Sequence, residues 1–231
     1  MITPALAQKF EVKPFILYEQ AAAKLEIDGV SSGYKFGVIG LSSTAPINNK
    51  INLRTDLGLS YVPSEKITFG GATFTGTFNG QYFSTTGRLN IKTLSGNKIY
   101  LNQSFSHRNT NSDNLNGEKN NAILTGTAVN VINAYDTVFN IKYAGHKNTN
   151  LSIGAGFHLW SFKARGTAAN LSDTVRAIKN ISAVGIDPLF QVFWQTKAFG
   201  TDVNIDFEYR SLNSKFNTGI GSLNIRYKLS F

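Results

Sequence analysis

The sequence predicts an all-β protein, a closed antiparallel up-and-down transmembrane β-barrel of about ten strands. The first supporting observation is the last stretch of the chain, where apolar residues occupy every second position from Leu223 to Phe231. The second is that a similar alternation recurs along much of the 231-residue chain. A period of two places alternate side chains on opposite faces of a strand. The third is that no apolar run reaches the roughly 18 residues of a membrane helix.

The last strand is two-faced up to its final aromatic residue. Chain ends usually fray into polar tails, so this pattern indicates apolar surroundings along the whole strand. A lipid bilayer provides them, but every backbone N–H and C=O in lipid must be paired. A sheet meets that requirement only when it closes into a barrel, with an apolar outside and a polar lumen. The apolar positions of this strand are Leu223, Ile225, Tyr227, Leu229 and Phe231.

This ending resembles the closing strand of bacterial outer-membrane β-barrels, and the general character is similar to the small OmpA and opacity proteins of Gram-negative bacteria. The resemblance implies location in the bacterial outer membrane, contact with lipid and lipopolysaccharide, and a monomeric barrel. It also implies that the five apolar residues of the last strand are the signal read by the barrel-assembly machinery. The resemblance is strongest over about the last thirty residues, and no loop motif of the family is matched.

The N-terminus predicts export. Ala5-Leu6-Ala7 has the small-x-small pattern that ends a secretory signal peptide, so residues 1–7 are interpreted as its remnant. An ordinary disordered tail is the alternative interpretation. Residues 8–231 contain no repeat, linker or shift in composition, and they are predicted to form a single barrel domain.

Strands are predicted wherever apolar and polar residues alternate. The cleanest internal strand is 51–61, in which Arg54 and Asp56 are on the polar face. Residues 123–143 share one parity and form a single long strand, unless a turn at 133–136 splits it. The other predicted strands lie within 9–18, 34–38, 82–94, 99–105, 151–160, 190–195, 203–210 and 219–231.

Three stretches without alternation are predicted as loops. Residues 62–81 are rich in Gly and Thr, and residues 107–121 are polar throughout. Residues 165–185 are predicted to hold a short helix with Ser172 as its N-cap. Ten strands place the Asn-rich loop and the helix-bearing loop together on the outer side, as bacterial barrels do with long loops. Counts of eight or twelve strands are the alternatives.

The lumen is predicted to collect charged residues, with basic groups in excess. Asp206 is expected about opposite Arg226, because buried charges need partners. The side chains form either a hydrogen-bonded plug in a narrow barrel or a water-filled path that weakly favours anions. The candidate lumen residues are Arg54, Asp56, Arg88, Lys92, Lys142, His158, Asp206, Glu208, Arg210, Arg226 and Lys228.

Nucleic acid is not predicted as a partner, although the formal net charge is +9, because the basic residues are scattered singly along the chain. No Cys is present, which excludes disulfides and zinc–thiolate sites. The three His residues belong to no catalytic or metal-binding motif, and His158 is interpreted as a satisfied lumen residue. The chain is therefore predicted to be no enzyme and to need no cofactor or metal.

These observations predict an outer-membrane barrel with a structural or surface-interaction role through its extracellular loops. A small porin-like channel for small, anionic solutes is the alternative within the same fold. The alternative from another class is a secreted or periplasmic β-sandwich that acts as a binding module, because a sandwich buries its core with the same alternation.

Overall fold

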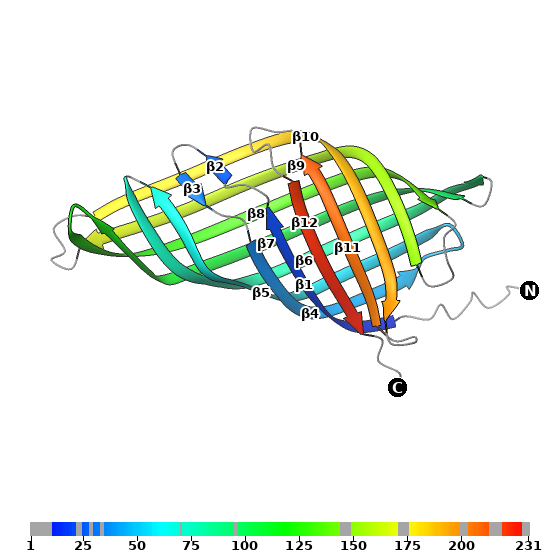
Figure 1. Cartoon of the computed structure of the whole chain (residues 1–231), viewed down its shortest axis with the longest axis horizontal. Helices are drawn as coiled ribbons and strands as arrows, with labels where there is room; N and C mark the ends of the chain where they lie inside the picture. The colour runs from blue at the N-terminus through cyan, green and yellow to red at the C-terminus, as the bar shows by residue number, and fades with distance from the viewer. Residues whose placement is uncertain are drawn as a thin grey trace, which may run out of the picture.

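The computed structural model describes residues 11–21, 25–27, 30–32, 35–69, 71–94, 97–143, 149–170, 176–198, 203–212 and 219–227. Among them there is no helix long and apolar enough to cross a membrane. Twelve strands lie within these residues (Figure 1). They are β1 (Glu11–Ala21), β2 (Leu25–Ile27), β3 (Val30–Ser32), β4 (Lys35–Pro46), β5 (Ile51–Phe69), β6 (Ala72–Leu94), β7 (Asn97–Lys119), β8 (Ala122–Tyr143), β9 (Thr149–Asn170), β10 (Arg176–Ala198), β11 (Val203–Leu212) and β12 (Gly219–Tyr227).

Ten of these strands form one closed antiparallel ring. Strand β1 pairs with β4, the strands from β4 to β12 pair in chain order, and β12 pairs with β1. The ring closes where Ile16 of β1 pairs with Ile225 of β12. The other two strands, β2 and β3, form a hairpin that joins β5 at Ser31 and Ser32. The prediction of a ten-stranded barrel is confirmed. The β-sandwich alternative is wrong, because a single continuous sheet closes on itself.

The strands differ in length by about a factor of two. Strands β5 to β10 have 19 to 23 residues, whereas β1, β4, β11 and β12 have 9 to 12. A membrane strand needs only about 9 to 11 residues. The long strands continue past β1 and β12 on one side in Figure 1. We call this the distal end, with turns at Gly71 and at Asn120–Asn121, and the opposite end, with the turn at 47–50, the proximal end.

The three predicted loops are wrong within the described residues. Residues 62–69 and 72–81 belong to β5 and β6, residues 107–119 to β7, and residues 165–170 and 176–185 to β9 and β10. The predicted helix start at Ser172 lies outside the described residues. Beyond the membrane no lipid demands apolar outward side chains, so alternation weakens although the backbone ladder continues.

A tight turn links β7 to β8 where a long loop was expected. Asn120 and Asn121 both have positive φ, 51° and 62°, as two-residue hairpin turns require and as Asn tolerates. The long-strand interpretation of 123–143 is confirmed, because β8 runs through 133–136 without a turn.

Exposed apolar side chains surround the proximal half of the barrel. Leu59 is 67% exposed and Ile186 66%, values that lipid explains and water does not. The belt ends distally in a polar row, where His107 Nδ1 is 2.7 Å from Asn133 Oδ1 and Asn133 donates to Ser161 Oγ at 3.1 Å. Other members of the belt include Ile39, Leu41, Leu57, Phe139, Ile153, Phe157, Leu159, Phe190 and Val192.

The interior is narrow and filled. Gly40 pairs with Gly58, and a Cβ at Gly40 would lie 2.0 Å from the Leu57 carbonyl oxygen, so only glycine permits this close approach. Apolar side chains fill the interior towards the distal end, where Leu115 is 0% and Phe74 1% exposed. This apolar plug consists of Phe15, Leu17, Phe36, Val38, Val62, Ile67, Ala72, Phe74, Phe78, Leu115, Ala128 and Ala168.

Candidate functional site

Two features outside the apolar plug carry polar groups: a network in the proximal interior and a notch on the distal outer face. In the network, Asp56 is 2% exposed and points inward from β5. Its Oδ2 accepts a hydrogen bond from Ser84 Oγ at 3.3 Å and lies 3.2 Å from Arg54 Nε. The ionised carboxylate is therefore compensated inside the barrel, as a buried charge must be.

A second buried carboxylate, Asp136, joins three neighbouring strands. His158 Nδ1 contacts its Oδ1, and Ser104 Oγ donates to its Oδ2 at 3.5 Å. The strand register puts Asp136 directly opposite both residues, so the contact follows from the ladder itself. The serine hydroxyl bonds the carboxylate and not the imidazole, so this group lacks the serine–histidine contact of a nucleophilic catalyst.

Other interior polar groups are paired as well, with the exception of Ser60 Oγ, which is buried without a hydrogen-bond partner among the described residues. Trp160 Nε1 donates to Asp187 Oδ2 at 2.7 Å, and the Trp160 ring lies over Gly185, where a Cβ would approach it to 2.5 Å. Arg88 Nε donates to Asn102 Oδ1 at 3.2 Å, and the guanidinium carbon is 4.4 Å from the centroid of the Tyr100 ring. The proximal interior is thus a hydrogen-bonded network that joins several strands.

One predicted lumen residue is on the wrong face. The ladder between β6 and β7 shifts between Asn90 and Lys92, and Lys92 pairs with Ile99. Because opposite residues of a ladder share a face, Lys92 shares the face of Ile99 and not that of the inward Tyr100. A shift of one residue reverses the facing of every later side chain, and alternation in the sequence does not reveal it.

Some predicted residues are described only by their backbone. The register places Asn224 opposite Asp206 and Asn204 opposite Arg226, so Asp206 and Arg226 lie two positions away from direct opposition. Glu208 and Arg210 lie in β11, opposite Ser222 and Ile220 of β12. Lys142 is half-buried in β8.

The structure describes only part of the proposed assembly signal. Leu223 and Ile225 pair with Tyr18 and Ile16 of β1, both exposed residues, and Tyr227 is the last residue of β12. Residues 228–231, which include Lys228, Leu229 and Phe231, lie outside the described residues, as does the signal remnant at 1–7.

Three interior carboxylates, Glu19, Asp136 and Asp187, were missed by the sequence reasoning. Asp136 lies where a turn was considered, and Asp187 follows the predicted loop 165–185. The parity of Asp136 relative to Tyr135 and Phe139 carried the signal, because it places Asp136 on the inward face. Among the described residues, no group of three or more His, Cys, Asp or Glu side chains could hold a metal ion.

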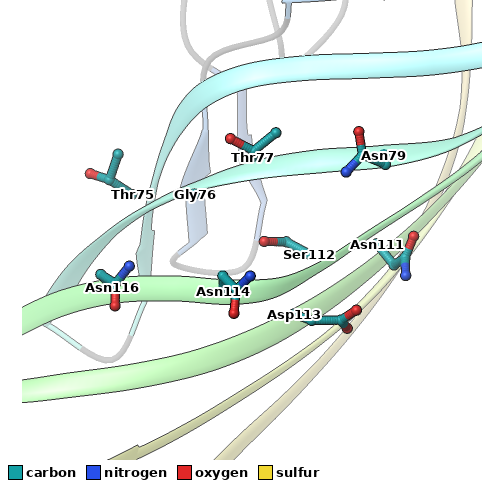
Figure 2. Close-up of a pocket in the computed structure, with 9 residues that line it drawn as sticks. All are labelled: Thr75, Gly76, Thr77, Asn79, Asn111, Ser112, Asp113, Asn114 and Asn116. Atoms are coloured by element: carbon teal, nitrogen blue, oxygen red, sulfur yellow. The ribbon is translucent and has the colours of Figure 1, made fainter.

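The notch lies between β6 and β7 in the distal half of the barrel (Figure 2). Its volume is about 360 Å³, near the lower end of the range for small-molecule sites. It forms where the β6–β7 ladder is interrupted, because four steps from Thr75 to Asn79 face five from Asn116 to Asn111. At the same level β7 also has one residue more than β8. A bulge of this kind interrupts the ladder and turns the extra side chains outward.

The floor of the notch is formed by Gly76 of β6 and Ser112 of β7. Ser112 extends between the two strands in Figure 2 and is 3% exposed. Its Oγ has no hydrogen-bond partner. A Cβ at Gly76 would lie 3.1 Å from that oxygen and 2.5 Å from Leu115 Cδ2, so these two side chains pack directly against Gly76 and leave room only for glycine. The walls are formed by Thr75, Thr77, Asn79, Asn111, Asp113, Asn114 and Asn116.

With this geometry established, comparison with solved structures shows what the fold is. The translocator domain of the autotransporter NalP from Neisseria meningitidis matches with a TM-score of 0.58 and 11% identity, over 95% of this chain and 88% of that one. The outer-membrane protease OmpT from Escherichia coli matches with a TM-score of 0.52 and 8% identity, over 98% and 99%. The chain is a bacterial outer-membrane β-barrel.

The apolar belt independently places this outer-membrane β-barrel in lipid. No protein-family model and no curated protein matches the sequence. At these identities the two structures establish the fold alone, so the activities of a translocator and a protease remain properties of those two proteins.

Proposed function

We propose that this outer-membrane β-barrel is a non-catalytic surface-recognition protein, in which the membrane-embedded half supports a rigid distal extension that binds ligands outside the cell. The observation that carries the proposal is the combination of an apolar plug with strands of about twice the membrane-spanning length. Leu115 at 0% exposure, Phe74 at 1% and Phe78 at 2% come from β6 and β7 within that plug.

The distal extension is suited to recognition because it is ordered β-structure. Paired strands present their outward side chains at fixed positions, so little conformational entropy is lost on binding. The polar outward faces of β6 and β7 extend the barrel into the aqueous phase above the row of His107, Asn133 and Ser161. Lipid contact by the belt, lipopolysaccharide around it, a monomeric state and recognition of β12 by the assembly machinery are further parts of this proposal.

Conductance distinguishes recognition from the alternative of a small channel. The refolded protein should insert into a planar bilayer without stable conductance steps, because the apolar plug packs the described part of the distal interior. Steps with anion preference would support the channel and contradict the recognition proposal. The inward carboxylates Asp56, Asp136 and Asp187 are buried, and their negative charge offsets that of the interior basic groups. An anion preference of the interior is therefore weakened.

The register defines variants that shorten the extension and keep the barrel. Removing 66–75 and joining Glu65 to Gly76 shortens the β5–β6 hairpin symmetrically, because Lys66 pairs with Thr75. Removing 166–179 shortens β9–β10 in the same way, because Gly166 pairs with Lys179. Cells displaying the full chain should bind to a panel of glycan- and protein-coated surfaces, and at least one shortened barrel should lose that binding. Equal binding by both shortened barrels would contradict the proposal.

A further inference from the structure

We infer that the notch between β6 and β7 binds a neutral sugar residue, with the Ser112 hydroxyl at its floor. This inference rests on the proposed function, for which it names a site and a ligand class. The argument starts from Ser112, whose buried Oγ is without a hydrogen-bond partner. An unsatisfied buried hydroxyl costs free energy, so a ligand group that pairs with it gains that energy on binding.

The chemistry of the walls selects the ligand class. Four amides, two threonine hydroxyls and one carboxylate line the walls, and no Lys, Arg or His does. Amides both donate and accept hydrogen bonds, which matches sugar hydroxyls that also do both. The carboxylate of Asp113 disfavours phosphate and other anions, and the absence of apolar walls disfavours a lipid chain or a hydrophobic side chain.

The side chains that line the notch are available to a ligand. The side chains that line the notch form no hydrogen bond with another described residue. In the proximal interior, by contrast, the carboxylates of Asp56, Asp136 and Asp187 are all hydrogen-bonded. The walls are exposed and the floor is buried, so a sugar ring of suitable size would bury one face and leave the other in water. The notch lies in the distal extension, which the proposed function places outside the cell.

Saturation-transfer NMR on the full chain, refolded in an amine-oxide detergent without sugar groups, tests the site. The probes are neutral disaccharides of glucose, galactose and N-acetylglucosamine, and the delipidated core oligosaccharide of lipopolysaccharide. Ser112→Ala and Asn114→Ala should each weaken binding of at least one probe about two- to tenfold, the usual range for one hydrogen bond. Ser182→Ala and Asn180→Ala are matched controls on exposed outward positions of β10 and should bind as the parent does.

The outcomes separate the sources of the sugar and the two proposals. Displacement of a bound disaccharide by the core oligosaccharide would identify the ligand as a sugar of the surrounding membrane. Binding of disaccharides alone would identify it as a sugar of an external glycan. Absence of binding by every probe, or equal loss in notch and control variants, would overturn the inference. Surface binding by displaying cells that survives Ser112→Ala and Asn114→Ala would overturn the notch and leave the recognition proposal standing.

Discussion

Replacing Phe74 with alanine tests whether the interior plug holds the distal extension together. Phe74 is 1% exposed, and its ring packs over Gly117 of the neighbouring strand β7. A Cβ at Gly117 would lie only 2.7 Å from Phe74 Cδ1. Phe74→Ala therefore removes a ring from a closed interior and leaves a cavity. The expected loss of unfolding free energy is about 3–5 kcal/mol, the transfer and cavity terms together.

Phe157 provides the matched control because it is 61% exposed on the lipid side. Lipid fills the space left by Phe157→Ala, so only the transfer term of about 1.5–3 kcal/mol should be lost. Urea titration in lipid vesicles measures both, with fluorescence from Trp160 and Trp194, the two tryptophans of the chain. A smaller loss for Phe74→Ala than for Phe157→Ala would show that the plug is not packed and would refute the reasoning.

Three other perturbations test the hydrogen-bonded network of the proximal interior, the close approach of strands at glycine and the assembly signal. Asp136→Ala should cost about 1–3 kcal/mol in the same titration, because the buried His158 loses its partner; unchanged stability would contradict the network. Gly156→Ala should abolish the heat-resistant band on gels, since a Cβ there would lie 1.8 Å from a backbone oxygen, whereas Gly87→Ala, with 3.9 Å, should retain it. Deleting Phe231 should reduce insertion into the outer membrane, and normal insertion would count against its role as a signal.

The sequence predicts the membrane-embedded half well because lipid enforces its pattern. Leu57 and Leu59 on the outer face of β5 alternate with Asp56 and Ser60 on the inner face, and exposure follows the same order. The strand count follows from the recurrence of this pattern around the ring. The Phe15 and Leu17 side chains depart from it, because β1 contributes apolar residues to the plug.

The structure of the distal half could not be predicted from the sequence, for two physical reasons. Outward residues there meet water, so a run such as Asn109 to Asn116 reads as a loop although the ladder holds it in β7. Bulges then change parity without a residue type that marks them, as at Lys92 and at Asp113. The notch depends on such a bulge, so a sequence pattern of period two cannot predict it.

The distribution of polar groups between the two halves argues for one function over the other. A solute path would have to pass the proximal network and then the plug around Leu115 and Phe78, where the side chains are 0% and 2% exposed. Opening that path would cost the packing of a closed core. The unpaired hydroxyl of Ser112, by contrast, lies at the floor of a notch that opens on the outer face. Within the described residues, this distribution favours the proposed recognition at the outer face of the distal extension over passage of a solute through the interior.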